Sequence, residues 1–259
     1  MRFKADIFKL LSKLKRNEHF AFTRFSDGEI LIMQNKELIL EKKYVKAGNV
    51  IHNFGYSEED YKHFDPSKHG FLKDKLMEAY TYKKDNYFVG GICQNCDCAS
   101  QEYASWMHEA YGELDANYTY ANLLVNSNYP IFVGQLYKVL KDKKIVIVCS
   151  ENADLSGVGL EVVKDFRVGR NCIVNDHNLV TEMKEWISEN DVIDHVFLFS
   201  ASSLSEVLIY ELFKDHDKNT YIDIGTTLHK QLGLKLEREY LRGYWNNTPS
   251  PDLYRSCDD

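Results

Sequence analysis

A short acidic motif ends the first apolar stretch of the chain, Phe22-Thr23-Arg24-Phe25-Ser26-Asp27-Gly28-Glu29. Asp27 and Glu29 lie two positions apart, so an extended or turning backbone would carry both carboxylates on one side. Paired oxygen ligands suit a hard cation such as Mg²⁺ or Mn²⁺. Arg24 could contact a phosphate or hold one of the carboxylates. Ser-Asp-Gly is also common in surface turns, so the motif alone predicts either a cation site or a turn.

A glycine-containing segment, Ser156-Gly157-Val158-Gly159, follows a strand-like apolar run at 145–149. Glycines there let backbone N–H groups approach a phosphate, and a helix expected to follow as far as about 166 would favour negative charge at its start. The third glycine of the dinucleotide motif and the Lys-Ser/Thr pair of a P-loop are both absent, so NAD and ATP motifs are not supported. The other interpretation is a tight turn with close helix packing.

A third acidic candidate, Asp223, ends the apolar run Tyr221-Ile222-Asp223-Ile224 and precedes Gly225. It could act as a general base, contact a ribose or support a metal ligand. Alternatively, its carboxylate accepts backbone N–H groups in the Gly225 turn. His229 and Glu237 on the following segment are further candidates.

Three closely spaced cysteines, Cys93, Cys96 and Cys98, could bind zinc with a ligand from elsewhere, such as His108. No second Cys-x-x-Cys exists, so loop or buried thiols are the alternative. Because the N-terminus shows no secretory signal, we expect reduced cysteines and a cytoplasmic protein.

The composition limits the classes of partner. The chain has 259 residues and a net charge of −7, which argues against nonspecific nucleic-acid binding. No apolar run approaches the roughly 20 residues that span a bilayer. Apolar residues recur at helical spacing over 1–17 with lysines between them, which predicts an amphipathic helix. Such a helix could touch a membrane surface or dock on the core, so a peripheral membrane contact stays open.

Strands and helices alternate along the chain, which predicts an α/β fold. We expect a Rossmann-like, doubly wound, mostly parallel sheet with flanking helices, in a single domain over 1–259 with a tail at 246–259. The expected strands are 19–25, 87–92, 145–149, 172–174, 196–199 and 221–224; the expected helices are 71–82, 100–125, 130–141, 159–166, 179–187 and 204–213. Residues 34–70 are expected to form loops and short pieces. Ligands bind such sheets at the carboxyl ends of the strands, where the loops at Ser26, Gly91, Ser150, Asn175, Ser200 and Gly225 would meet.

Taken in order, these motifs resemble a known family. Arg24-Phe25-Ser26-Asp27-Gly28-Glu29 is similar to the Arg-Phe-Gly-Asp-Gly-Glu signature of the bacterial GT-D-fold glycosyltransferases, a Rossmann-like group with an Asp-x-Glu motif. The segment 145–159, the unit 197–210 and Tyr221-Ile222-Asp223-Ile224-Gly225 resemble later segments of that family. The similarity spans about 18–245.

The resemblance implies a site. Asp27 and Glu29 would hold Mn²⁺ or Mg²⁺ against the diphosphate of a nucleotide sugar, and Asp223 would be the family's strand-end aspartate. The residues implied to contact or approach the phosphates and the nucleotide are Arg24, Gly28, Ser156, Gly157, Gly159 and Asn175, with Asn178 an alternative to the last.

Three departures from the family pattern stand out: Ser26 replaces a glycine, Leu155 replaces a common arginine, and the 91–100 loop is unlike the family's. The expected activity is metal-dependent transfer of a hexose from a UDP-sugar to a glycan or glycoconjugate acceptor. The alternatives are a metal-dependent nucleotide-sugar hydrolase and a non-catalytic nucleotide-binding protein. The sugar, the acceptor, the anomeric outcome and a homodimer stay open.

Overall fold

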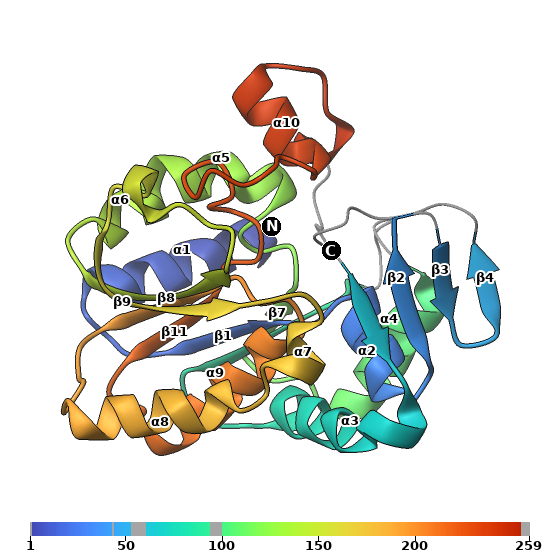
Figure 1. Cartoon of the computed structure of the whole chain (residues 1–259). Helices are drawn as coiled ribbons and strands as arrows, with labels where there is room; N and C mark the ends of the chain where they lie inside the picture. The colour runs from blue at the N-terminus through green and yellow to red at the C-terminus, as the bar shows by residue number, and fades with distance from the viewer. Residues whose placement is uncertain (1, 43, 53–60, 94–99, 255–259) are drawn as a thin grey trace.

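A sheet of seven strands forms the centre of the computed structural model, which describes residues 2–42, 44–52, 61–93 and 100–254 (Figure 1). The strand order is β7-β6-β1-β11-β10-β8-β9, and every neighbouring pair is parallel. This confirms the expected doubly wound, parallel α/β architecture. The strands are β1 (Ala21–Arg24), β6 (Tyr87–Gly91), β7 (Tyr118–Tyr120), β8 (Lys144–Ser150), β9 (Glu161–Val168), β10 (Val196–Phe199) and β11 (Thr220–Asp223).

Helices cover both faces of this sheet, and each face has its own apolar cluster. On one face lie α2 (Asp27–Met33), α3 (Pro66–Thr81), α4 (Gln101–Tyr111), α7 (Cys172–Asn175), α8 (Leu179–Glu189) and α9 (Leu204–Asp215). On the other lie α1 (Arg2–Lys15), α5 (Tyr129–Ile131), a π-turn at Phe132–Leu136, α6 (Tyr137–Leu140) and α10 (Glu239–Asn246). The apolar run 145–148 in strand β8 is buried on both faces of the sheet. Val146 and Val148 face the first layer of helices, whereas Ile145 and Ile147 face the second.

Helix α1 docks on the core. Its apolar stripe, Ile7, Leu10, Leu11 and Leu14, is at most 3% exposed. The stripe is therefore covered by protein and is not available to a membrane surface. Among the residues described, no helix has the length and apolar character needed to cross a bilayer.

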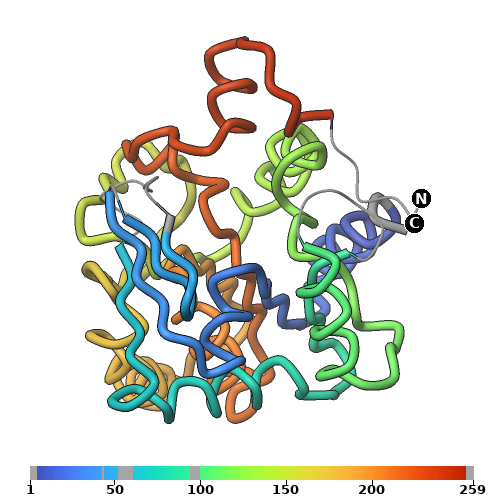
Figure 2. The backbone as a smooth tube through the Cα atoms, turned by 90° about the vertical axis from the view of Figure 1, so that its right-hand side faces the viewer, coloured from blue at the N-terminus to red at the C-terminus, as the bar shows by residue number. Residues whose placement is uncertain are grey.

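A second, smaller sheet occupies the region expected to be loops. Its strands are β2 (Leu38–Glu41), β3 (Tyr44–Ala47), β4 (Val50–His52) and β5 (Lys62–Phe64), antiparallel in the order β4-β3-β2-β5. Figures 1 and 2 show it beside α2. The short pieces expected here are strands that pair into a sheet, which the sequence does not predict because glycine and proline commonly interrupt strands. Gly48, with φ of +60°, makes the tight turn between β3 and β4.

Three local predictions were also wrong. The segment after Gly159 is strand β9, whose alternation of exposed and covered side chains suits a sheet edge. Cys172-Ile173-Val174 is not a strand but begins the short helix α7, after Asn171 in the left-handed conformation. Helix α4 ends at Tyr111, before Gly112 with φ of +77°, and β7 follows where the helix was expected to continue.

Candidate functional site

A cleft of about 810 Å³ lies at the carboxyl ends of the central strands. Its walls include Ser26, Ser150, Ser200 and Gly225, which are four of the six loop residues expected to meet there. Asn175 lines a neighbouring cavity instead, and Gly91 is not among the described residues that line either space.

Asp27 and Glu29 lie in the first turn of helix α2, not on the extended or turning backbone that was expected. Ser26 is the residue that precedes the helix, and its backbone N–H and Oγ each lie 3.0 Å from Oε2 of Glu29. A serine followed three positions later by glutamate is a typical helix start, because the carboxylate satisfies a backbone donor. Glu29 therefore points back toward the start of its own helix.

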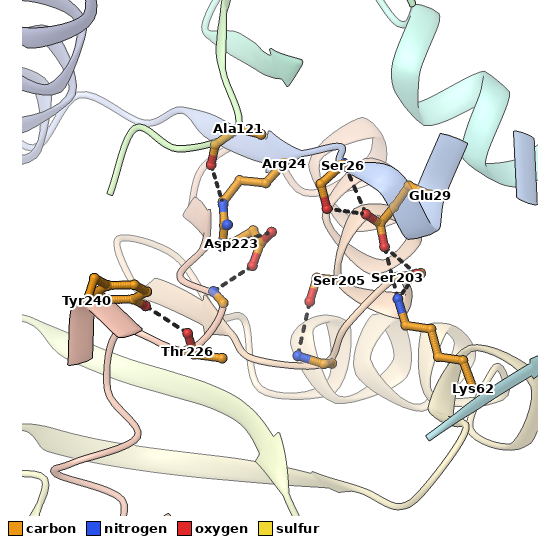
Figure 3. Close-up of polar contacts among 12 residues, drawn as sticks. Arg24, Ser26, Glu29, Lys62, Ala121, Ser203, Ser205, Asp223, Thr226 and Tyr240 are labelled. Atoms are coloured by element: carbon orange, nitrogen blue, oxygen red, sulfur yellow. Dashed lines mark hydrogen bonds and ion pairs between the residues drawn. The ribbon is translucent and has the colours of Figure 1, made fainter. Parts of the chain in front are cut away.

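The second oxygen of Glu29 is also occupied (Figure 3). Lys62 of strand β5 lies with Nζ 3.2 Å from Oε1, and Ser203 donates its hydroxyl to the same oxygen. Burial raises the pKa of Glu29, but Lys62 and the two serines outweigh burial and bring that pKa down to about 2. Glu29 is thus a buried, ionised carboxylate with a partner on each oxygen.

Lys62 is a site residue that the sequence analysis missed. Its Nζ also lies 2.8 Å from Oγ of Ser203, and its side chain is 14% exposed. Burial lowers the pKa of the ammonium group, but Glu29 raises it more, so Lys62 stays charged. Gly28 leaves room for it, since a Cβ there would lie 3.0 Å from Nζ.

Asp27 differs from Glu29 because it is an exposed residue that lines the cleft. Within the described residues, no other side chain forms a hydrogen bond or ion pair with it. Surrounding protein raises the pKa of Asp27, and the negative charge of Glu29 raises it further. Asp27 is therefore the member of the pair that can accept a ligand from the cleft.

Arg24 and Asp223 face each other at the ends of β1 and β11. Nη1 of Arg24 lies 4.0 Å from Oδ2 of Asp223, and Nε donates to the carbonyl of Ala121 at 2.6 Å. Oδ1 of Asp223 accepts the backbone N–H of Gly225 at 2.8 Å, as in the turn interpretation. Burial raises the pKa of Asp223, whereas Arg24 lowers it.

Glu206, in the first turn of α9, is a further carboxylate that the sequence analysis missed. It lines the cleft and is 2% exposed, and no described group forms a hydrogen bond with its Oε2. Burial raises its pKa well above the usual value, and the negative charges of Asp223 and Glu29 add to this shift. Three buried carboxylates thus face two cations, Arg24 and Lys62, and burial beside the other two negative charges favours the protonated form of Glu206.

The glycine segment does not reach the cleft. Ser156, Gly157 and Gly159 are absent from its lining, and Leu155–Gly157 form a short 3₁₀ turn that leads into β9. A Cβ on Gly157 would lie 2.9 Å from the carbonyl oxygen of Gln231, and Gly159 has φ of +60°. Close packing and turn geometry account for these glycines, and no helix follows them to favour a phosphate.

Asn175 faces a cavity of about 570 Å³ beside the main cleft. Its Nδ2 donates to the carbonyl of Arg170 at 2.8 Å, and Arg170 lines both spaces. Asn178, the alternative, precedes helix α8 and lines neither. Of the two later candidates, His229 lines the main cleft and Glu237 does not. Lys235 and Arg238 add positive charge to its wall.

A zinc site at the cysteines is not supported. Cys93 is buried and disulfide-bonded, which contradicts the expectation of reduced thiols there. Cys96 and Cys98 lie outside the described residues. Across the described part of the chain, no three His, Cys, Asp or Glu side chains are grouped as metal ligands.

The donor atoms in the cleft fit the expected divalent cation only in part. The carboxylate of Asp27 is open to a cation, which suits Mg²⁺ or Mn²⁺ with water and substrate oxygens in the other positions. Glu29 does not fit as the second ligand, because Ser26, Lys62 and Ser203 engage both its oxygens.

Three solved structures share this fold and carry the domain of unknown function 1792. One, described as having a distinct glycosyltransferase fold, is 16% identical, with a TM-score of 0.55 over 88% of this chain and 81% of that one. Another, described as a new glycosyltransferase from Streptococcus sanguinis, is 17% identical, with a TM-score of 0.55 over 90% and 85%. A selenomethionine form of the domain gives the same values as the first. No family model and no curated protein matches the chain.

Proposed function

We propose that the chain is a glycosyltransferase that moves a hexose from a nucleotide diphosphate sugar to a glycan or glycoconjugate acceptor. A UDP-sugar is the first donor to test. The cleft supports this proposal, because it lies at the strand ends and combines buried cations with an open carboxylate. The fold likeness adds support at the level of fold class, and membership of the GT-D family is part of the proposal.

In this proposal, Arg24 binds the donor diphosphate. Asp223 and the carbonyl of Ala121 hold the guanidinium group of Arg24 in place. A planar guanidinium suits phosphate oxygens, and a charge fixed in advance stabilises the diphosphate as it leaves. Asp27 would hold a Mn²⁺ or Mg²⁺ ion, which supplies further positive charge to the leaving group when bound. Asp223 is buried and engaged, so we assign it a positioning role in place of the general-base, ribose-contact and metal-supporting roles considered from the sequence.

The test is a panel of nucleotide sugars, with Mn²⁺ or EDTA, and with or without candidate acceptors. Nucleotide release that requires an acceptor supports a transferase, and release without acceptor supports the hydrolase alternative. If nucleotides bind and none is turned over, the chain is a nucleotide-binding protein. If no donor binds or reacts, the proposal is wrong.

A further inference from the structure

We propose that Lys62 is a built-in cation of the donor site: its ammonium binds an oxygen of the donor diphosphate, and Glu29 is its counter-ion. The inference rests on the proposed function. It differs from the expectation for Asp27-Gly28-Glu29, because it assigns Glu29 to a lysine in place of a metal ion.

Lys62 lies in the proposed donor cleft. Lys62 lines the same cleft as Arg24 and Asp27, although it comes from the small antiparallel sheet and not from the central one. Figure 3 shows its side chain reaching toward Glu29 and Ser203. The small sheet therefore supplies a positive charge to a cleft that residues of both sheets line.

The hydrogen-bonding capacity of Lys62 carries the second step. An ammonium group has three N–H donors and no acceptor. Glu29 and Ser203 accept two of them, at 3.2 and 2.8 Å. One donor is left on a group that lines the cleft, and a phosphate oxygen is a strong acceptor for it. Arg24 lines the same cleft and could contact the same diphosphate.

The bonds of Glu29 carry the third step. A carboxylate that serves as a metal ligand needs an oxygen facing the ion, but both oxygens of Glu29 already accept hydrogen bonds. Separating Lys62 from Glu29 would leave two buried charges unpaired, which is strongly destabilising. The ion pair is therefore the stable arrangement. In the absence of a donor, the positive charge of Lys62 is compensated by the negative charge of Glu29.

A purely structural role is the competing explanation, in which the ion pair only joins the small sheet to α2. The two explanations differ in what Lys62 does to ligand affinity. A structural clamp changes the stability of the fold and leaves nucleotide affinity unchanged. A donor-site cation changes both, since a hydrogen bond to a charged group is lost from the ligand.

The experiment is calorimetric titration of the full chain with UDP, once with EDTA and once with Mn²⁺. The variants are Lys62→Met and the double variant Glu29→Gln/Lys62→Met, in which no buried charge is left unpaired. Lys73→Gln is the matched control, because Lys73 is a more exposed lysine on α3, outside the cleft lining. Circular dichroism at the titration temperature confirms that each variant is folded.

We expect wild type and the control to bind UDP in EDTA. Both Lys62 variants should bind about tenfold to a hundredfold more weakly, the loss of one charged hydrogen bond, and Mn²⁺ should not restore the affinity. Wild-type affinity in the folded double variant would overturn the inference, as would wild-type binding that disappears in EDTA; acceptor-dependent turnover by wild type would leave the proposed function standing in both cases. If wild type binds UDP in neither condition, the inference and the UDP donor class are both wrong.

Discussion

Gly225 leaves the space that the guanidinium group of Arg24 occupies. A Cβ on Gly225 would lie 2.0 Å from Nη1 of Arg24, and Gly225 has φ of +49°, which disfavours any other residue. The turn after β11 and the last residue of β1 are therefore matched in shape.

Gly225→Ala should displace Arg24 and weaken UDP binding by about tenfold or more, because a charged hydrogen bond to phosphate is lost. Titration with UDP measures the effect. Gly134→Ala is the matched control, because a Cβ at Gly134 would meet no atom within 4 Å. Unchanged UDP affinity in a folded Gly225→Ala variant would show that Arg24 does not contact the donor.

The two carboxylates of the acidic motif should respond differently to mutation. Asp27→Asn should lower the Mn²⁺-stimulated turnover at least tenfold with little change in stability, because Asp27 is exposed and forms no hydrogen bond or ion pair with a described side chain. Donor turnover with and without Mn²⁺, together with the thermal midpoint, measures this. Equal Mn²⁺ stimulation in wild type and Asp27→Asn would contradict a metal ion at Asp27.

Glu29→Gln should instead destabilise the fold, by about 3 kcal/mol, because it leaves Lys62 buried without its counter-ion. The low pKa of Glu29, about 2, makes this contribution fully present above the usual carboxyl range. The contribution is lost as the pH falls toward 2. Urea unfolding of wild type and variant at a series of pH values measures the difference, which should shrink on acidification. A difference that does not change with pH would contradict the ion pair.

The contribution of Glu206 to the stability of the fold should depend on pH in the opposite direction to that of Glu29. Its pKa is raised in the fold, so its contribution to stability is largest below the usual carboxyl pKa and decreases as the pH rises toward the folded value. Glu206→Gln keeps the side chain neutral. The stability of this variant relative to wild type should therefore increase as the pH rises from about 5 to 8. Thermal midpoints across this range measure the effect, with the exposed Glu185→Gln as control. Parallel curves for Glu206→Gln and wild type would show that Glu206 is ionised.

The variant Gly157→Ala distinguishes a packing role of Gly157 from a role in phosphate binding. A Cβ at Gly157 would press on the carbonyl of Gln231, and overpacking of this kind costs about 1–3 kcal/mol. UDP affinity should stay within twofold of wild type, since Gly157 does not line the cleft. A large loss of UDP affinity in the folded variant would restore the phosphate role expected for this glycine.

The parallel sheet could be predicted because buried strands such as β8 and β10 contain short, continuous apolar runs and are separated by an amphipathic helix. The segment after Gly159 could not, since a glycine turn before an edge strand resembles one before a helix. The presence of Arg24, Asp27 and Asp223 in the cleft could be predicted, because each lies at or just after the end of an apolar strand. The neutralising partners did not, because Lys62 lies 33 positions after Glu29 and Ser203 lies 174 after it, and only tertiary packing joins them. The compartment and the number of chains in the assembly stay predictions.

The contact between the small sheet and helix α2 links ligand binding to local opening of the fold. Strand β5 brings Lys62 to Glu29, and its neighbour β2 lies at the start of a meander through β3 to β4. A donor that binds Lys62 would hold β5 against α2 and reduce the transient openings that let amide hydrogens exchange with solvent. The protection of β2, β3 and β5 in deuterium exchange would then rise with donor occupancy, so that the exchange of the small sheet reports whether the cleft is occupied.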